Sequence, residues 1–143
     1  MVQNVYEVQL KPVGDSRGYL LPIEIGRDVV PFEVRRIYYM YGIPDGKGRG
    51  CHAHMDLRQI LICVHGSCKV TCDYGGNRTI ETYVLDRPEK GLVIEGLVWR
   101  EMSDFSPGTV LLVLADEHYD VAAPKEIRDH DIFLKTVERE KEK

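Results

Sequence analysis

Short stretches of alternating apolar and polar residues recur along most of the chain, and turns rich in glycine and proline separate them. Alternation with a period of two is typical of strands that bury one face. Many short strands at close spacing are typical of a β-sandwich or β-barrel, so the pattern predicts an all-β fold. The predicted strands and extended segments are Val5–Leu10, Tyr19–Ile25, Val34–Tyr41, Arg49–Gly66, Ser67–Tyr74, Thr79–Leu85, Leu92–Ile94, Leu97–Met102 and Thr109–Ala115.

The C-terminal stretch lacks this alternation. Lys125–Glu140 is charged, and its apolar residues are scattered irregularly. It is expected to form a short helix or turn region, followed by a frayed tail over Glu138–Lys143. Turn-forming residues predict a turn at Pro12–Gly18 and a flexible loop at Gly42–Gly48. No internal repeat or linker interrupts the pattern, so residues 1–143 are expected to form a single domain.

Composition and charge narrow the class of protein. Of the 143 residues, 43% are hydrophobic and 29% are charged, which is ordinary for a globular protein. The net charge of −4 gives no reason to expect nucleic acid or an anionic membrane as a partner. No apolar run approaches the roughly 20 residues of a membrane span, so a cytoplasmic protein is expected.

Four cysteines agree with a reducing compartment. Cys68 and Cys72 stand four apart in a predicted strand, which is too far for a disulfide between them. Cys51 lies next to two histidines, but alternation turns it away from them, so a packing role is expected. All four are therefore predicted to be reduced.

His52 and His54 are the most distinctive chemical feature of the sequence. They stand two residues apart, ahead of the apolar run Ile60–Val64. In an extended strand both imidazoles point to one face, and Ala53 points to the other. Because imidazole titrates near neutral pH, such a pair can move protons, bind a metal ion or hydrogen-bond a ligand. These residues by themselves leave the three roles open.

The stretch resembles the first motif of the cupins, which are small β-barrels of jelly-roll type. That motif combines HxH, an acidic residue and a later glycine, and this chain has HAH at residues 52–54, Gln59 and Gly66. In the second cupin motif, the stretch Ile94–Trp99 puts Trp99 where cupins have their last metal-binding histidine. The resemblance implies a cupin jelly-roll β-barrel. Since two of its four metal ligands are replaced, no metal is expected.

A narrower resemblance extends from about Val5 to Lys135 and points to the nucleotide-sugar 3,4-ketoisomerases within the cupins. The combination of HAH, VWREM, the DSRG turn and a late YD is specific. The matching residues are Asp15–Gly18, Pro31-Phe32, Arg36–Tyr39, Arg49–His54, Leu57, Gln59, Gly66–Cys68, Val98–Met102, Asp104-Phe105, Val113–Ala115 and Tyr119-Asp120.

Enzymes of this group move the ketone of dTDP-4-keto-6-deoxyglucose from C4 to C3 without a cofactor, in the biosynthesis of dTDP-3-amino-3,6-dideoxyhexoses. The resemblance implies that His52 is the catalytic base, that His54 shuttles protons or orients groups beside it, and that Tyr38 hydrogen-bonds the sugar oxygens. It implies that Arg49 pairs with the diphosphate. The full set of implied substrate-binding residues is Arg17, Arg49, Gln59, Trp99, Arg100 and Tyr119.

Two further expectations concern geometry. Alternation places Trp99 and Arg100 on opposite faces of their strand, so one of them is expected not to face the sugar. The resemblance also implies a homodimer in which N-terminal strands, such as Val5–Leu10, are exchanged between subunits. The pair Arg17 and Arg100 leaves open whether the C4 hydroxyl of the product is equatorial or axial.

Two other functions compete with this hypothesis. The first is a metal-dependent cupin enzyme, such as a dioxygenase, with ligands supplied from Glu101 or His65. The second is a non-catalytic module that binds sugar nucleotides. A 3,5-epimerase is disfavoured, because its histidine–aspartate pattern is not evident in this sequence.

Overall fold

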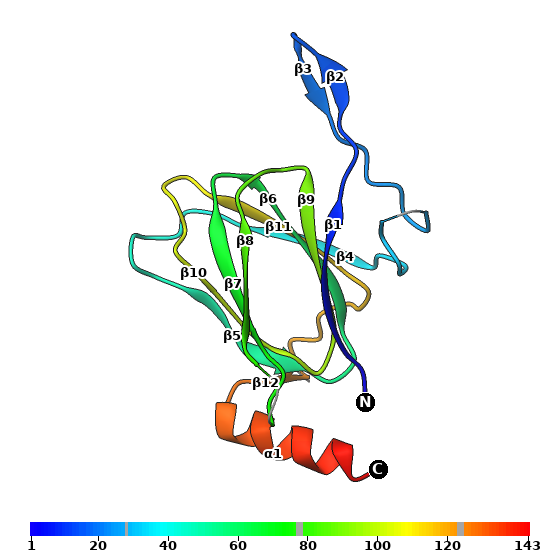
Figure 1. Ribbon diagram of the computed structural model, residues 1–143, viewed down its shortest axis with the longest axis vertical. Coiled ribbons are helices and arrows are strands. Elements are labelled where there is room, and N and C mark those ends of the chain that lie inside the picture. Colours follow the sequence, from blue (N-terminus) through cyan, green and yellow to red (C-terminus); the bar gives the residue numbers. More distant parts are fainter. Residues whose placement is uncertain (28, 77–78, 123–124) are drawn as a thin grey trace.

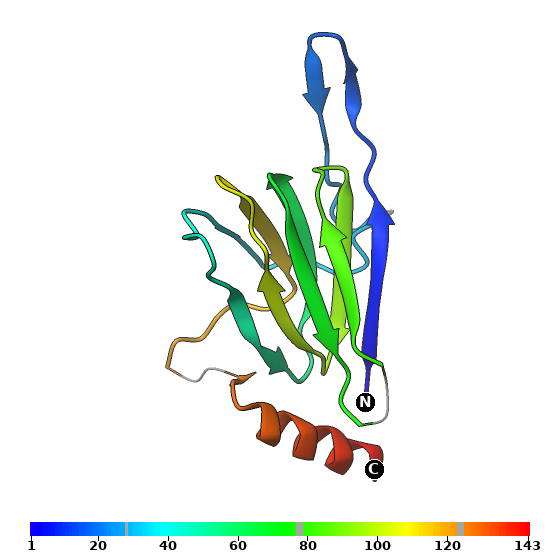
Figure 2. The ribbon, with the colours of Figure 1, turned by 60° about the vertical axis from the view of Figure 1, so that its left-hand side comes forward.

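The computed structural model describes residues 1–27, 29–76, 79–122 and 125–143. In this part of the chain, two five-stranded antiparallel sheets face each other (Figures 1 and 2). The strands of one sheet, in spatial order, are β1 (Gln3–Gln9), β9 (Lys90–Gly96), β6 (Arg58–His65), β11 (Val110–Ala115) and β4 (Arg36–Met40). Those of the other are β12 (Glu126–Ile127), β5 (Arg49–His54), β10 (Trp99–Ser103), β7 (Cys68–Asp73) and β8 (Glu81–Leu85).

The main core lies between the two sheets. Strands β6, β9 and β11 are nearly continuous apolar runs because both of their faces are buried. On the outer face of their sheet, Val30 and Phe32 pack against Ile60, Ile62 and Leu114. The buried residues of the inner core are Leu61, Cys63, Cys68, Val70, Cys72, Tyr74, Leu85, Leu92, Ile94, Val98, Met102, Leu111 and Val113.

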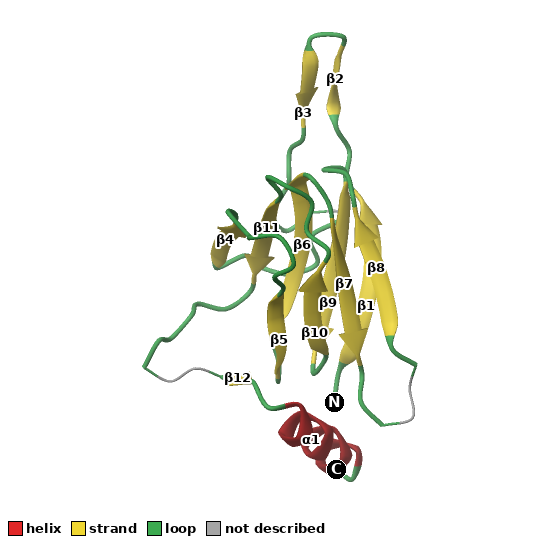
Figure 3. Ribbon diagram, turned by 90° about the vertical axis from the view of Figure 1, so that its left-hand side faces the viewer, coloured by secondary structure: helices red, strands yellow, loops and turns green. Residues whose placement is uncertain are grey.

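A hairpin of β2 (Val13–Asp15) and β3 (Gly18–Leu20) projects from one end of the barrel (Figures 1 and 3). The predicted turn at Pro12–Gly18 contains the tip of this hairpin, but Val13–Asp15 is paired as a strand. The extended segment expected over Tyr19–Ile25 is regular strand only as far as Leu20. Pro22 follows, and it has no N–H to donate to a ladder.

Helix α1 (His130–Lys141) lies across the opposite end of the barrel (Figure 3). The Asp129 side chain caps it by accepting a hydrogen bond from the Ile132 N–H at 3.0 Å. The fraying predicted from Glu138 is wrong, because the helix continues to Lys141 and buries Val137 against the barrel.

The predicted all-β fold with a short C-terminal helix is confirmed. Strands β4, β7, β8 and β11 fall within the ranges that the alternation predicts. The two-residue strand β12 is not among the predicted strands, since so short a segment carries no periodicity. Among the described residues, no helix is long and apolar enough to cross a membrane.

Candidate active site

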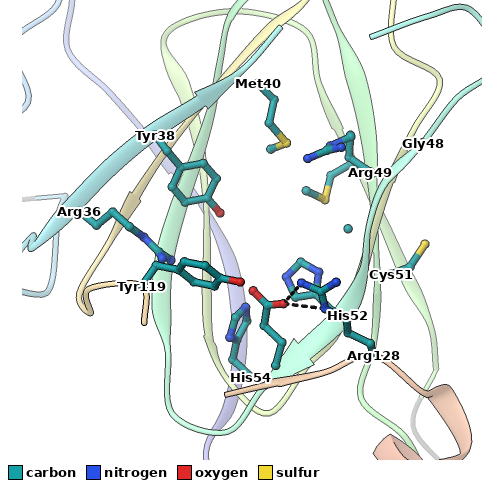
Figure 4. A pocket seen from close by; sticks show the side chains of 13 residues that line it. Arg36, Tyr38, Met40, Gly48, Arg49, Cys51, His52, His54, Tyr119 and Arg128 are labelled. Carbon is teal, nitrogen blue, oxygen red and sulfur yellow. Dashed lines mark hydrogen bonds and ion pairs between the residues drawn. The ribbon is translucent and has the colours of Figure 1, made fainter. Parts of the chain in front are cut away.

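A cavity of about 570 Å³ lies between the two sheets, lined mainly by β4, β5 and the segment around β12 (Figure 4). A volume of this order is typical of small-ligand sites. Of the residues that the sequence predicts for the site, His52, His54, Tyr38, Arg49 and Tyr119 line it. The lining residues are Arg36, Tyr38, Met40, Gly48, Arg49, Gly50, Cys51, His52, His54, Met102, Tyr119, Glu126 and Arg128.

The two histidines share the cavity face of β5, as alternation predicts. Their ring centroids are 4.8 Å apart and the rings are nearly perpendicular, at 89°. Ala53 between them is fully buried on the opposite face, where it packs with Phe133 of α1. His54 is only 8% exposed, and His52 is half-buried.

Burial and nearby guanidinium groups keep both imidazoles uncharged. Burial is the main cause that lowers the pKa of His54, to about 2, and the charge of Arg100 is the next. Burial and Arg100 also lower the pKa of His52, while a hydrogen bond to the Gly50 carbonyl and the charge of Glu126 oppose them. A neutral imidazole is the form that accepts a proton, and His52, the more exposed of the two, is the better placed to act as base, since the very low pKa of His54 makes it a weak one.

A β-bulge in β5 brings Arg49 to the cavity. Glu101 pairs with Gly50 and Arg100 pairs with His52, so Cys51 is the extra residue of the bulge. Both bulge residues have positive φ, 88° at Gly50 and 60° at Cys51. Regular alternation would put Arg49 and His52 on opposite faces, and the bulge places both beside the cavity.

The same bulge leaves Cys51 exposed. Its side chain points away from the histidine rings, as alternation predicts (Figure 4). The expected packing role of Cys51 is wrong, since no core surface covers the thiol. The other three cysteines are buried, and all four are free thiols.

Beneath the cavity, a chain of hydrogen bonds joins Arg100, Gln59 and Tyr38. The Arg100 Nη1 donates to Gln59 Oε1 at 2.5 Å, and the Gln59 Nε2 donates to the Tyr38 hydroxyl at 3.0 Å. Gln59 and Arg100 are 2% and 1% exposed, and neither lines the cavity. The direct substrate contact expected of both residues does not fit their place outside the cavity lining, and they support Tyr38 from below instead.

Trp99 lies on the outer face of β10. Its indole packs against His130 and Phe133 of α1, with ring centroids 5.0 Å and 5.8 Å away, and its Nε1 donates to Glu101. Of Trp99 and Arg100, it is Trp99 that faces away from the barrel interior and the cavity, so its predicted substrate-binding role is wrong. The physical reason is the alternation itself, which points Arg100 into the barrel and Trp99 toward the helix.

Three charged residues that the sequence analysis did not assign also line the cavity. The guanidinium of Arg36 lies 5.1 Å from the ring centroid of Tyr38 and 5.4 Å from that of Tyr119. Arg128 donates to the Glu126 carboxylate from Nε at 2.8 Å and from Nη2 at 2.5 Å. Arg36 could have been found, because it alternates with Tyr38 in a motif already singled out. Glu126 and Arg128 follow a stretch with no periodic signal.

The chain matches the family described as FdtA: WxcM-like, C-terminal, over residues 3–138. It belongs to the FdtA family. The TDP-4-oxo-6-deoxy-alpha-D-glucose-3,4-oxoisomerase of Aneurinibacillus thermoaerophilus is 40% identical to it over 130 residues, or 91% of this chain and 90% of the relative.

Solved structures agree with this membership in the FdtA family. A 3,4-ketoisomerase from Helicobacter canadensis is 39% identical, with a TM-score of 0.88 over 96% of this chain and 99% of its own. The 3,4-ketoisomerase QdtA from Thermoanaerobacterium thermosaccharolyticum, in a histidine-to-asparagine variant bound to TDP-4-keto-6-deoxyglucose, is 38% identical, with a TM-score of 0.87 over 97% of each chain. These likenesses confirm the predicted family and its cupin-like fold.

Cupins commonly hold a metal ion, but the donor set of this FdtA-family cavity does not fit one. Arg100, a buried cation, occupies the interior beside the histidines and uses the oxygen of Gln59 as its own acceptor. A divalent ion next to this cation would be repelled, and beside the two imidazoles the cavity offers only the Glu126 carboxylate, which Arg128 already pairs. Within the described residues, no group of three or more His, Cys, Asp or Glu side chains is arranged to hold a metal.

Arg17 does not reach the cavity of its own chain. It lies at the tip of the β2–β3 hairpin, where its side chain is 88% exposed and pairs with Asp15. Because the hairpin projects away from the barrel, a substrate contact by Arg17 needs a second subunit (Figure 2).

Proposed function

We propose that this protein is a dTDP-4-keto-6-deoxyglucose 3,4-ketoisomerase, a cytoplasmic enzyme made of one domain. The observation that carries the proposal is the pair of neutral, largely buried imidazoles that share a cavity with Tyr38. The relatives support the substrate. One is named for this oxoisomerisation, and a variant of another is bound to TDP-4-keto-6-deoxyglucose.

The reaction needs no external oxidant or reductant, because C3 is oxidised as C4 is reduced. His52 removes the proton on C3, and the electron pair of that C–H bond forms a C3–C4 double bond. The carbonyl oxygen at C4 takes a proton, which gives an enediol. The C3 hydroxyl then loses its proton as C4 gains one, and the ketone stands at C3. The depressed pKa of His52 keeps this base unprotonated at neutral pH.

Protons must also move between the neighbouring oxygens on C3 and C4. His54 and the Tyr38 hydroxyl flank the space beside His52, and both can donate and accept (Figure 4). We assign proton transfer between the oxygens to this pair. The Tyr119 hydroxyl points into the same space and is assigned to binding the sugar (Figure 4).

The diphosphate requires cations at the cavity. Arg49 lines the cavity and has no ion-pair partner among the described residues. A guanidinium suits a diphosphate because it forms paired, charge-assisted hydrogen bonds. Arg36 is a second cation of the lining, and its buried Nε has no hydrogen-bond partner among the described residues. Together the two groups supply the positive charge that a nucleoside diphosphate needs.

A homodimer with exchanged N-terminal segments completes the proposal. The projecting hairpin carries exposed apolar side chains, Val13, Tyr19 and Leu20, which favours contact with another protein surface. On the edge strand β4, Ile37 and Tyr39 are exposed as well. A partner's hairpin packed near this edge would bring its Arg17 toward the cavity, where it could bind the substrate.

One experiment tests the function. Protein treated with a chelator is incubated with dTDP-4-keto-6-deoxyglucose, and the ring carbons are followed by NMR. We expect the ketone signal to move from C4 to C3, and the spectrum to report the C4 configuration. Turnover that required added iron, manganese or zinc would support a metal-dependent cupin instead. Binding of dTDP-4-keto-6-deoxyglucose, with no exchange of its C3 hydrogen in deuterated solvent, would support a non-catalytic module.

A further inference from the structure

The hydrogen-bond chain beneath the cavity has a fixed direction. An arginine side chain only donates hydrogen bonds, so the atom of Gln59 that faces Arg100 must be the amide oxygen. The amide nitrogen then faces Tyr38 and donates to its hydroxyl oxygen. Arg100 also donates from Nε and Nη2 to the Val98 carbonyl, which holds the guanidinium in place.

This direction determines what the Tyr38 hydroxyl can do. Its oxygen accepts the hydrogen bond from Gln59, so its own hydrogen has to point elsewhere. The hydroxyl faces the cavity in Figure 4, and the free direction is toward the sugar. A tyrosine held in this way offers a donor to a substrate oxygen, which is what a developing enediolate oxygen requires.

We propose that Gln59 is a positioning residue that sets the Tyr38 hydroxyl as a hydrogen-bond donor to the substrate, with Arg100 fixing the orientation of the Gln59 amide. The inference rests on the proposed ketoisomerase function. It also gives the buried cation a role, because Arg100 has no carboxylate within ion-pair distance among the described residues. Gln59 stands at the position where a metal-binding cupin has a carboxylate, and here it acts through an amide hydrogen.

Two substitutions of similar size separate positioning from packing. Gln59→Glu puts an acceptor where the Nε2 donor stands, so Tyr38 would donate to the introduced carboxylate and turn its hydrogen away from the substrate. Gln59→Met removes the donor without adding an acceptor, and leaves the Tyr38 hydrogen free to face the cavity. If Gln59 only fills space, the isosteric glutamate should be the milder change.

We expect the opposite order in kinetics measured with dTDP-4-keto-6-deoxyglucose. Gln59→Glu should lower kcat by about tenfold or more, because donation to the transition state is lost, with KM changed less than about threefold. Gln59→Met should retain several times the kcat of Gln59→Glu. In a Tyr38→Phe background, the two Gln59 variants should differ by less than about twofold, since the group through which Gln59 acts is absent.

Unfolding curves and dTDP binding by calorimetry identify variants that are folded. A Gln59→Glu enzyme with nearly wild-type kcat would overturn the proposal, as would a Gln59→Met enzyme slower than Gln59→Glu. An equal penalty for Gln59→Glu with and without the Tyr38 hydroxyl would overturn it too. A wild-type protein that fails to move the ketone would instead contradict the proposed function itself.

Discussion

Arg100 and His52 lie directly opposite each other in the backbone register of the neighbouring strands β10 and β5. Its guanidinium is almost fully buried, and burial lowers its own pKa to about 10, so it remains charged at neutral pH. This charge is the second largest cause of the depressed pKa values of both histidines, after burial. The barrel interior therefore holds a fixed cation beside the imidazole pair, and that cation favours the neutral, unprotonated form of both rings.

Substitution of the proposed base tests the catalytic assignment. His52→Asn keeps a polar side chain of similar reach but cannot accept the C3 proton. We expect kcat to fall by about 10² to 10⁴, the usual contribution of general-base catalysis, while dTDP binding is retained. Steady-state kinetics and calorimetry measure the two effects.

His65→Asn is the matched control, because His65 is exposed at the end of β6 and does not line the cavity. That variant should keep its activity within about twofold of wild type. Near-normal turnover by His52→Asn would show that another group removes the proton.

The stability of the fold should fall on mild acidification. Because the pKa of His54 in the folded chain is about 2, against 6.5 ordinarily, the unfolded chain binds more protons between these values. The free energy of unfolding therefore rises with pH in this window, and falls as the pH drops below about 6.5. His54 contributes up to about 1.4 kcal/mol per pH unit to this slope.

Urea unfolding at about pH 7, 6 and 5 measures the dependence, and His54→Asn isolates the contribution of this residue. We expect the variant to lose less stability on acidification than the wild type does. If the free energy of unfolding depended on pH equally in the two proteins, His54 would be protonated as readily in the folded chain as in the unfolded chain.

The bulge at Gly50 should be intolerant of a side chain. A Cβ at Gly50 would lie 2.9 Å from the Arg100 carbonyl oxygen and 3.0 Å from Met102 Sδ, at a φ of +88°. Gly50→Ala should therefore cost more than the roughly 1–2 kcal/mol of the backbone strain alone, and should raise KM by displacing Arg49.

Gly46→Ala is the control for backbone strain. Gly46 has a similar φ of +76°, but nothing lies within 4 Å of its Cβ position. Thermal unfolding and KM should change clearly more for Gly50→Ala than for Gly46→Ala. If both variants behave alike, the close packing at the bulge has no energetic consequence.

Mixed dimers test whether Arg17 acts on a partner's cavity. Arg17→Ala and His52→Asn subunits are each expected to be poorly active alone. If hairpins are exchanged, one cavity of every mixed dimer combines an intact His52 with an intact Arg17. With random mixing half of the dimers are mixed and one of their two cavities is complete, so about a quarter of wild-type activity should return. Activity no greater than the average of the two variants would mean that Arg17 does not act in trans.

The sequence by itself determined the class of fold and the chemistry of the strand that carries the histidines. Period-two alternation predicted most of the strands, and it placed His52 and His54 on one face, because strand geometry is local. Local alternation also required Trp99 and Arg100 to face opposite ways, although it did not tell which of them faces the cavity.

Only the tertiary structure decided the contacts that depend on how strands meet. The bulge that brings Arg49 beside His52 is a mismatch of register between β5 and β10, which alternation in one strand does not reveal. Gln59 and Arg100, 41 residues apart, form a buried chain to Tyr38 instead of the substrate contacts that the sequence predicts. The projecting hairpin separates Arg17 from the cavity of its own chain. In each case the reason is that partners distant in sequence, not local periodicity, fix where a side chain lies.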